Sequence, residues 1–443
     1  MKQYFMSPSQ TLLTSFGLLI GMGTLLLMLP FASVNQTWLP FIDALFTATS
    51  AATTTGLVVV DTGSYFSFFG QLVIMFLIQI GGLGYMIFIA IAILGLGGKL
   101  SLVDKLILNE SIAHPSSLNI KKFVKIVIVL TLSFELIGAG LLTLFWLKDF
   151  PLGQAIYYGV FHSVSAFCTA GFVLFSDSFI EWRGDLGLNL VIIVLSLAGA
   201  IGFFVHYDVY TVIKARLNKN FIYGFSAYTK MVVMITGGLI GWATIMMMAG
   251  TWPEAYSLKE RMLASIFQSV SASTTTGFNT VDIAVLAPIS LLAIIFLMFI
   301  GASSGGTGGG IKTSTVGVLA LFVLSFLRGE EDVQFFKRRL PDTLILRAVA
   351  ILLIMLAWLA MTLMILLLTE KGTFLQLVFE MTAAVSSGGL SMGITSSLSP
   401  GGKFLMVLTM LVGRVGPLAI GYSLLGKIKP THYRNATAEM LVG

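Results

Sequence analysis

The chain has 443 residues, of which 56% are hydrophobic and only 10% are charged, and its mean hydropathy is +0.95. Because soluble domains carry about a quarter charged residues, this composition excludes a soluble globular protein and indicates an integral membrane protein. The single cysteine, Cys168, excludes a disulfide framework, and four scattered histidines argue against a histidine metal centre. The net charge of +6 matters through its distribution along the chain, not as a sign of nucleic-acid binding.

Eight apolar runs follow one another along the chain, each long enough for a spanning helix, which needs about 20 residues. They cover residues 10–30, 68–97, 121–147, 188–213, 228–250, 287–326, 345–368 and 402–426. The stretch from Met1 to Val34 also has features of a cleaved signal peptide. We interpret its apolar run as a spanning helix, because it is long enough to cross and because the repeat described next needs it as a first helix.

A shorter segment lies between the two runs of each pair and occurs four times. The copies align on Gly56, Gly171, Gly277 and Gly389, which are 115, 106 and 112 positions apart. Ten residues before each glycine stands a phenylalanine: Phe46, Phe161, Phe267 and Phe379. Two residues before it stands a hydroxyl residue: Thr54, Thr169, Thr275 or Ser387. Matching registers at near-equal spacing indicate a four-fold internal repeat.

Each copy is too short to cross a membrane and too apolar for a surface loop, so we expect a re-entrant pore helix followed by a strand. Non-helical backbone at membrane depth is tolerated where it lines a water-filled cavity, and four such strands therefore need a common polar axis. The predicted fold is an all-α integral membrane protein. In it, four tandem helix–re-entrant pore loop–helix repeats surround one ion pore in a pseudo-four-fold arrangement. The repeats cover residues 1–105, 106–220, 221–335 and 336–443, the last with a cytoplasmic C-terminal tail, and their pore loops cover about 40–62, 153–178, 259–283 and 373–395.

The strands are typical of a selectivity filter for a monovalent cation. Their carbonyl oxygens would replace the water around the ion, hydroxyl side chains would add ligands or brace the strand, and glycine would permit the backbone to turn its carbonyls inward. The predicted ion-binding residues are Thr53, Thr54, Thr55, Gly56, Cys168, Thr169, Ala170, Gly171, Thr274, Thr275, Thr276, Gly277, Ser386, Ser387, Gly388 and Gly389.

A glycine-rich run interrupts the second apolar run of the third repeat, at 287–326. Each glycine costs a helix interior about 1 kcal/mol relative to alanine, so the run predicts a broken helix. A nucleotide site is rejected, because no strand precedes the run and Ile311 separates it from Lys312. Two interpretations stay open: a flexible gate just inside the filter, or a passive packing notch. The predicted gate residues are Gly305, Gly306, Thr307, Gly308, Gly309, Gly310, Lys312 and Arg414.

Arg414 lies near the middle of the last apolar run. A charge at the bilayer centre costs about 2.5 kcal/mol or more and usually faces a cavity. One interpretation is a positive barrier below the filter that also pairs with carbonyls of the glycine-rich run. The other is a structural clamp tied to helix-end carbonyls.

Charges outside the apolar runs predict the orientation. Lysines and arginines concentrate in the connections between repeats and in the C-terminal tail, so both termini are expected in the cytoplasm. Three aspartates, Asp61, Asp177 and Asp282, follow a repeat glycine by five or six residues. They would attract cations at the outer mouth, or they would only cap turns. The charged connection from Arg328 to Asp342 would help to dock a cytosolic partner, or its basic residues would only set the topology.

These motifs resemble the Trk/Ktr/HKT superfamily of potassium transporters, over nearly the whole chain. The similarity rests on the four glycine segments, the Ile-Gly-Gly-Leu-Gly run at Ile80 to Gly84, the glycine-rich run before Ile311 and Lys312, and Gly-Arg-Val-Gly-Pro at Gly413 to Pro417. It is greatest to the membrane subunits of the bacterial Ktr branch. The second copy departs from the pattern, because Cys168 stands where the first and third copies have threonine.

The resemblance implies potassium uptake across the plasma membrane, often sodium-dependent, with potassium as substrate, sodium as a candidate activator and no covalently bound cofactor. It also implies a homodimer in membrane lipid, on a KtrA-like cytosolic regulatory ring that binds ATP/ADP or NAD(H). Glycine at all four positions favours potassium. Two transport hypotheses are kept: a gated potassium pore, and a stoichiometric symporter coupling potassium to sodium or protons. A membrane enzyme is disfavoured, because the apolar runs hold little beyond His206 and Asp208 that could do chemistry.

Overall fold

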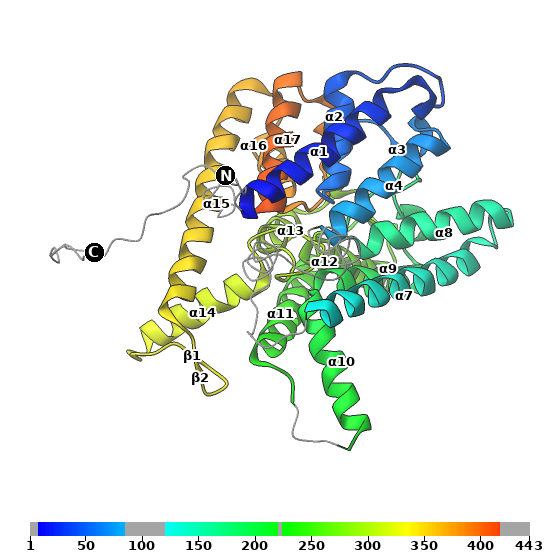
Figure 1. Cartoon of the computed structure of the whole chain (residues 1–443). Coiled ribbons are helices and arrows are strands. Elements are labelled where there is room, and N and C mark those ends of the chain that lie inside the picture. Colours follow the sequence, from blue (N-terminus) through cyan, green and yellow to red (C-terminus); the bar gives the residue numbers. More distant parts are fainter. Residues whose placement is uncertain (1–7, 85–119, 220–223, 417–443) are drawn as a thin grey trace, which may run out of the picture.

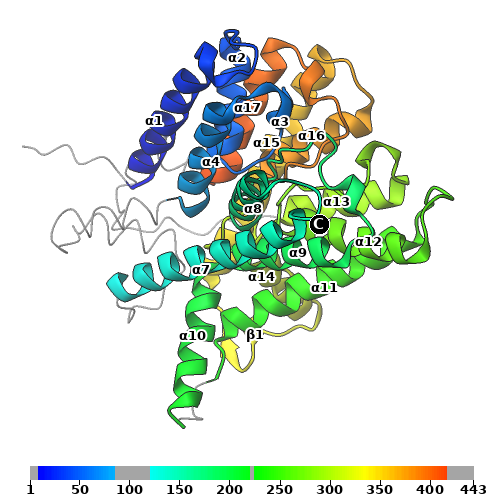
Figure 2. The same ribbon diagram turned by 90° about the vertical axis from the view of Figure 1, so that its right-hand side faces the viewer.

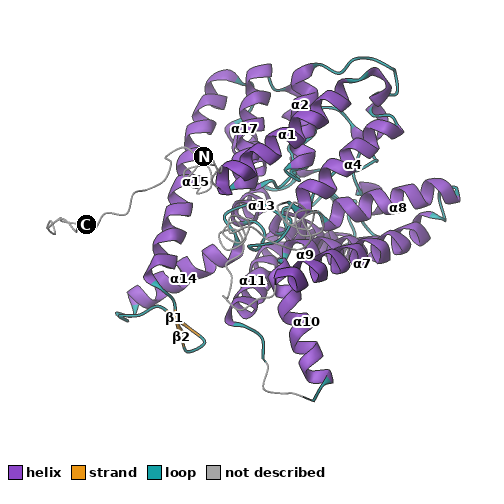
Figure 3. Ribbon diagram, viewed as in Figure 1, coloured by secondary structure: helices purple, strands orange, loops and turns teal. Residues whose placement is uncertain are grey.

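A computed structural model describes residues 8–84, 120–219 and 224–416. Helices make up most of the described chain (Figure 3). Its strands, β1 (Gln334–Phe335) and β2 (Arg338–Arg339), form one antiparallel hairpin. The all-α architecture predicted from the sequence is therefore confirmed.

The helices follow a common order in the regions of the four predicted repeats. The first region holds α1 (Pro8–Met28), the 3-10 turn η1 (Pro30–Ala32), α2 (Phe41–Ala52), α3 (Thr62–Tyr65) and α4 (Phe68–Leu83). The second holds α7 (Ile120–Trp146), α8 (Leu152–Phe167), η2 (Ile180–Trp182), α9 (Leu186–Ala200) and α10 (Phe203–Leu217). The third holds α11 (Ala227–Ala249), α12 (Leu258–Ser273), η3 (Ile283–Val285), α13 (Pro288–Ile300) and α14 (Thr313–Leu327). The fourth holds α15 (Asp342–Thr369), α16 (Phe374–Ser386), η4 (Thr395–Ser397) and α17 (Pro400–Val415).

Four of these helices, called the first helices below, begin their regions: α1, α7, α11 and α15. Within the described residues, α7, α11 and α15 are long and apolar enough to cross a membrane, and the bent pair of α9 and α10 makes a fourth candidate. On α15, large apolar side chains such as Leu353 and Leu368 are exposed. An exposed apolar helix face of this kind suits contact with lipid.

The second helices, α4, α9, α13 and α17, begin at local start signals. The side chains of Ser67, Asp185 and Ser399 each accept a hydrogen bond from a backbone amide in the first turn, and α13 instead has Pro288 at its first position. Such caps satisfy amides that have no partner inside the helix.

Each second helix stops early, at a glycine in the left-handed region. These glycines are Gly84, Gly202, Gly301 and Gly416, with φ values of 51°, 98°, 73° and 91°. The helices have only 16, 15, 13 and 16 residues, whereas a full span needs about 20. In the third region the chain resumes as α14 after the glycine-rich run. In the second region α10 leaves α9 at 97°, so the prediction of one continuous helix over 188–213 was wrong. The reason is Gly202, whose φ no L-residue helix allows.

The contacts between the second helices and the short helices, α2, α8, α12 and α16, form a closed cycle around the four regions. The second helix of one region contacts the short helix of the next: α4 with α8, α9 with α12, α13 with α16, and α17 with α2. The last contact joins opposite ends of the chain, and Figures 1 and 2 show the blue α2 beside the orange α17. By contrast, α10 projects away from the other helices (Figure 1).

The repeated phenylalanines anchor the short helices in the core. Phe46, Phe161, Phe267 and Phe379 are each at most 1% exposed. Burying one such ring contributes about 1.5–3 kcal/mol. Equivalent anchors at equivalent positions give the four short helices the same depth in the protein.

Candidate ion-conducting site

The four glycine segments, residues 53–56, 168–171, 274–277 and 386–389, continue directly from the ends of the short helices. In the first, the Thr54 amide donates to Ala51 O at 3.1 Å and the Thr55 amide donates to Ser50 O at 2.7 Å. The same pair of bonds recurs in the other three segments. This pattern is a Schellman motif, which ends a helix with one residue in the left-handed conformation.

The left-handed residue of the motif is a threonine or serine in every segment, although glycine is the usual choice. Thr54, Thr169, Thr275 and Ser387 have φ values of 52°, 51°, 55° and 53°. A β-branched residue at positive φ is an outlier, and left-handed backbone costs about 1–2 kcal/mol per non-glycine residue. At three of these positions the hydroxyl contacts the glycine-rich run, as described below, whereas the Ser387 hydroxyl has no hydrogen-bond partner among the described residues.

The repeat glycines bring the four backbones together. Gly56, Gly171, Gly277 and Gly389 all have positive φ, between 65° and 88°. A Cβ added to Gly56 would lie 2.5 Å from Ala170 O, and one added to Gly171 would lie 2.5 Å from Thr276 O. On Gly277 it would meet Gly389 Cα at 2.9 Å, and on Gly389 it would collide with Thr55 O. Each glycine therefore faces the backbone of the next segment, and the order of contacts closes on itself.

Side chains brace the segments differently. Thr53 and Thr55 share a hydroxyl–hydroxyl hydrogen bond of 2.7 Å, and Thr274 and Thr276 share another of 2.7 Å. The second segment has no such pair, because Cys168 and Ala170 occupy these positions. There the Cys168 thiol lies 3.9 Å from Glu135 Oε1 and 4.0 Å from Gln79 Oε1, on helices of two different regions.

The glycine-rich loop, residues 301–312 between α13 and α14, lies against all four glycine segments. Thr54 Oγ1 donates to Thr307 O at 3.2 Å, and the hydroxyls of Thr169 and Thr307 are 3.1 Å apart. The Gly309 amide donates to Thr275 Oγ1 at 3.0 Å. A Cβ on Gly309 would lie 2.9 Å from Ser387 Cβ. The left-handed residue of every segment therefore contacts the loop.

Two cations hold this loop. Lys312 Nζ donates to Gly308 O at 2.5 Å and to Gly309 O at 3.3 Å. Arg414, on α17, donates to Thr307 O and to Gly81 O, and to Gly82 O at 3.0 Å. Its guanidinium thus joins the loop to the end of α4. The sequence left two roles open for Arg414, pairing with the loop and clamping a helix end, and these contacts fit both.

The remaining predicted gate residues lie away from the glycine segments. Gly305 O accepts from the Phe203 amide at 3.0 Å. A Cβ on Gly306 would lie 2.6 Å from Ala200 O, and one on Gly310 would lie 2.7 Å from Gly301 Cα. These three glycines fix the loop to the break between α9 and α10 and to the end of α13, while Thr307, Gly308 and Gly309 form its contact surface with the segments.

The aspartates considered for an outer mouth have structural partners in two of three cases. Asp61 accepts from the Ser64 amide at 2.7 Å and caps α3, and Asp282 accepts from the Ala284 amide at 2.9 Å and caps η3. Asp177 is exposed, and its φ-positive neighbour Ser178 turns the chain. The capping explanation accounts for Asp61 and Asp282.

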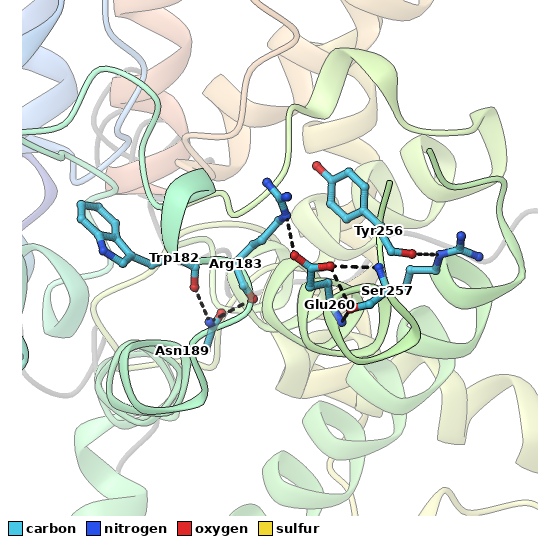
Figure 4. Close-up of polar contacts among 7 residues, drawn as sticks. Trp182, Arg183, Asn189, Tyr256, Ser257 and Glu260 are labelled. Carbon is cyan, nitrogen blue, oxygen red and sulfur yellow. Dashed lines mark hydrogen bonds and ion pairs between the residues drawn. The ribbon is translucent and has the colours of Figure 1, made fainter. Parts of the chain in front are cut away.

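A polar clasp, missed from the sequence, joins the second and third regions (Figure 4). Arg183 Nε lies 3.0 Å from Glu260 Oε1, and the Arg183 guanidinium lies 4.6 Å from the centre of the Tyr256 ring. Glu260 Oε2 also accepts from the Ser257 amide at 2.9 Å and completes a capping box at the start of α12. The Ser257-x-x-Glu260 spacing signals the box, but no pattern in the sequence predicts its partner Arg183.

Comparisons with known proteins identify the chain's relatives. A family model described as a cation transport protein, TrkH, matches residues 1–425. The Ktr system potassium uptake protein B of Bacillus subtilis is 36% identical over 99% of this chain and 97% of its own length. The potassium/sodium uptake protein NtpJ of Enterococcus hirae is 32% identical over 99% of this chain and 98% of its own length.

The fold has a solved counterpart. The crystal structure of the potassium transporter TrkH from Vibrio parahaemolyticus matches with a TM-score of 0.74 and 21% identity, over 98% of this chain and 87% of that one. The matched proteins are transport proteins, and the resemblance read from the sequence is confirmed. The chain belongs to the TrkH family of cation transport proteins, within the Trk/Ktr superfamily, and is similar to its KtrB members.

Proposed function

We propose that the chain takes up potassium ions across the plasma membrane through one pore. The four glycine segments surround that pore as a selectivity filter in pseudo-four-fold arrangement. The observation that carries this proposal is the closed cycle of close approaches at Gly56, Gly171, Gly277 and Gly389. A ring of four backbone segments with no room for a side chain at the glycines can offer carbonyl oxygens to a dehydrated cation. The names of the relatives, potassium uptake protein B and potassium/sodium uptake protein NtpJ, support potassium as the ion.

The glycine-rich loop is the gate in this proposal. It contacts the left-handed residues at the end of each short helix, so it occupies the inner side of the segments in the orientation predicted from the sequence. Its hydrogen bonds to Thr54, Thr169 and Thr275 involve side chains that are fully buried. An ion leaving the filter would meet this loop, and conduction therefore requires it to move.

Regulation in this proposal comes from the cytosol. The Ktr system names of the relatives support a partner subunit, and we assign it the form of a nucleotide-binding ring beneath a homodimer of this chain. With both termini cytoplasmic, the β1–β2 hairpin and its flanking acidic residues face that ring. Sodium dependence belongs to the same proposal and is supported by the potassium/sodium name of NtpJ.

Flux into proteoliposomes tests the filter. Gly56→Ser places a Cβ within 2.5 Å of Ala170 O and forces the carbonyl ring apart, so it should lower the ratio of potassium to sodium uptake by about tenfold or more. Gly241→Ala is the matched control, because a Cβ there meets nothing within 4 Å. An unchanged ratio in serine variants of all four repeat glycines would overturn the filter. A fixed ion ratio per transport cycle, measured from the zero-flux voltage, would favour a coupled symporter.

A further inference from the structure

The short helices carry a second repeated position, nine residues before each glycine. Its occupants are Thr47, His162, Gln268 and Glu380, and all four are at most 1% exposed. The position lies five or six residues before the end of each short helix, within reach of the chain that follows the glycine.

Three of the four occupants make that contact, at the third residue after the glycine. His162 Nε2 accepts from the Leu174 amide at 3.1 Å. Gln268 Nε2 lies 3.5 Å from Thr280 Oγ1. Glu380 Oε1 accepts from the Met392 amide at 2.9 Å. Thr47 is the exception, because its hydroxyl donates to Asp43 O on its own helix at 2.9 Å.

Glu380 makes the most of these contacts. Its carboxylate also accepts from Ser391 Oγ at 2.5 Å and from Thr395 Oγ1 at 2.7 Å, and Ser391 Oγ in turn accepts from the Gly393 amide at 2.9 Å. One buried side chain therefore fixes residues 391–395 through three hydrogen bonds.

The fourth segment lacks the braces that support the others. Six residues before the glycine, Ser50, Ser165 and Ser271 bond to the glycine amide or to the carbonyl after the glycine, at 3.1, 2.8 and 2.7 Å. The fourth segment has Ala383 at that position. It also has Gly388 where the first and third segments have the second threonine of a hydroxyl pair. Two consecutive glycines without these side-chain braces give this strand more conformational freedom than the other three, and its local support is the hydrogen bond from the Leu390 amide to Gly388 O at 2.8 Å.

We propose that Glu380 is the positioning residue of the fourth segment, and that it sets the segment's contribution to potassium selectivity by hydrogen bonding rather than by its charge. The proposal rests on the filter function proposed above. Glu380 touches no ion in this scheme. It holds residues 391–395, and these hold the carbonyls of Gly388 and Gly389 in the ring.

Two substitutions separate hydrogen bonding from charge. Glu380→Gln keeps the length of the side chain and an oxygen acceptor for the Met392 amide, and it removes the charge. Glu380→Leu removes every acceptor. We expect Glu380→Leu to lower the ratio of potassium to sodium uptake in proteoliposomes by about tenfold, and Glu380→Gln to retain most of the ratio. Thr47→Val is the matched control at the same repeat position and should leave the ratio unchanged.

Each result of these measurements either supports the Glu380 proposal or overturns it. A folded Glu380→Leu protein with unchanged selectivity overturns the proposal, and so does a Glu380→Gln protein that loses as much as Glu380→Leu, since charge would then be the cause. If Glu380→Leu does not insert, the double variant Ser391→Ala, Thr395→Val replaces it. That variant keeps Glu380 and removes two donors, so a lowered ratio supports the proposal and an unchanged ratio refutes it.

The variant Gly389→Ser is measured in the same assay to test the filter assignment separately. If it shifts the ratio while the Glu380 and Ser391/Thr395 variants do not, only the inference fails; if it too leaves the ratio unchanged, the filter assignment itself fails.

Discussion

At the scale of single residues, three threonines with positive φ connect the glycine segments to the glycine-rich loop. Thr54, Thr169 and Thr275 each occupy a position where glycine would be less strained. Each places its hydroxyl within 3.2 Å of an atom of the glycine-rich loop. The strain at the ends of α2, α8 and α12 is thus offset by contacts that connect the candidate filter to the candidate gate.

Substitutions of Arg414 test the connection between the candidate filter and the candidate gate. Its guanidinium bonds to Thr307 in the loop and to Gly81 and Gly82 on α4. Arg414→Ala removes a positive charge and a bond that holds the loop, so potassium uptake should rise severalfold, or at least not fall, while the folded yield stays intact. Arg414→Lys is the paired variant: it keeps the charge and loses the planar fork that reaches three carbonyls.

The two variants together separate the explanations of Arg414. Faster uptake in both variants assigns the effect to the lost bonds, and faster uptake in the alanine variant alone assigns it to the charge. A collapse of the yield of folded Arg414→Ala, with flux falling in parallel, would show a structural clamp, because several buried acceptors would be left unpaired at about 1–3 kcal/mol each.

At the scale of elements, each second helix ends at or beside a glycine, and the two breaks that the structure describes, after α9 and after α13, differ in how far the sequence reveals them. The glycine-rich run between α13 and α14 is visible as five glycines in six residues. The break between α9 and α10 lies at the single glycine Gly202, whose φ is 98°. A Cβ there would lie 2.7 Å from Ser304 O of the loop, and the amide of the next residue, Phe203, bonds to Gly305 O. Isolated glycines in apolar runs are common, so periodicity alone could not locate this break.

The fit of the glycine-rich loop gives an element-scale prediction. A Cβ on Gly309 would collide with Ser386 O, which is backbone and cannot give way. Gly309→Ala should therefore displace the loop from the fourth segment and raise potassium flux severalfold, and deletion of part of Gly305 to Gly310 should do the same. Gly17→Ala, where a Cβ meets nothing within 4 Å, should leave flux unchanged. Stopped-flow flux with a potassium-sensitive dye checks this, and wild-type flux in every folded loop variant would reduce the loop to packing.

The polar clasp at the start of α12 predicts a pH dependence. Hydrogen bonds from the Ser257 amide and hydroxyl, and then Arg183, hold the pKa of Glu260 below its ordinary value of 4.5. A group with a lowered folded pKa stabilises the fold above its unfolded pKa, and this contribution is lost as the pH falls through the folded pKa. The purified protein should therefore lose stability below about pH 4.5, by less than about 1 kcal/mol from this partly exposed pair.

Thermal unfolding of Glu260→Gln checks the assignment. This variant should be less stable at neutral pH and should show a smaller drop than the unchanged chain as the pH falls from 6 to well below 4.5. An identical pH dependence in the two proteins would remove the clasp from the account.

At the scale of the whole molecule, the sequence predicted the repeated motifs better than the contacts between the four regions. The four glycine registers and the all-α architecture follow from the spacing of motifs and apolar runs in the sequence. Inter-region contacts do not follow from spacing. Examples are Glu260 with Arg183, and Lys403 with Asp43 at 2.7 Å, the latter joining α17 to α2 across 360 positions. Such pairs depend on how the ring of helices closes, and one sequence contains no signal for them.

The charged surface around the β1–β2 hairpin is where we predict that a cytosolic partner docks. Glu330 and Glu331 are both exposed, and Glu330 also lies 3.9 Å from Arg328 and accepts from Ser325 Oγ at 3.0 Å. Reversing both charges, Glu330→Lys with Glu331→Lys, should weaken co-purification with a nucleotide-binding ring by about tenfold and leave membrane insertion intact. Unchanged co-purification would mean that the charges of this connection only set the topology.

The claim that four glycine segments surround one ion path is tested most directly by locating ions. Rubidium or thallium can replace potassium, and their anomalous scattering marks their positions in crystals of the purified protein. The account predicts peaks on the common axis of the segments, within coordination distance of the carbonyls of Thr55, Ala170, Thr276 and Gly388. Ordered ion peaks elsewhere in the membrane region, with none between these four carbonyls, would contradict it.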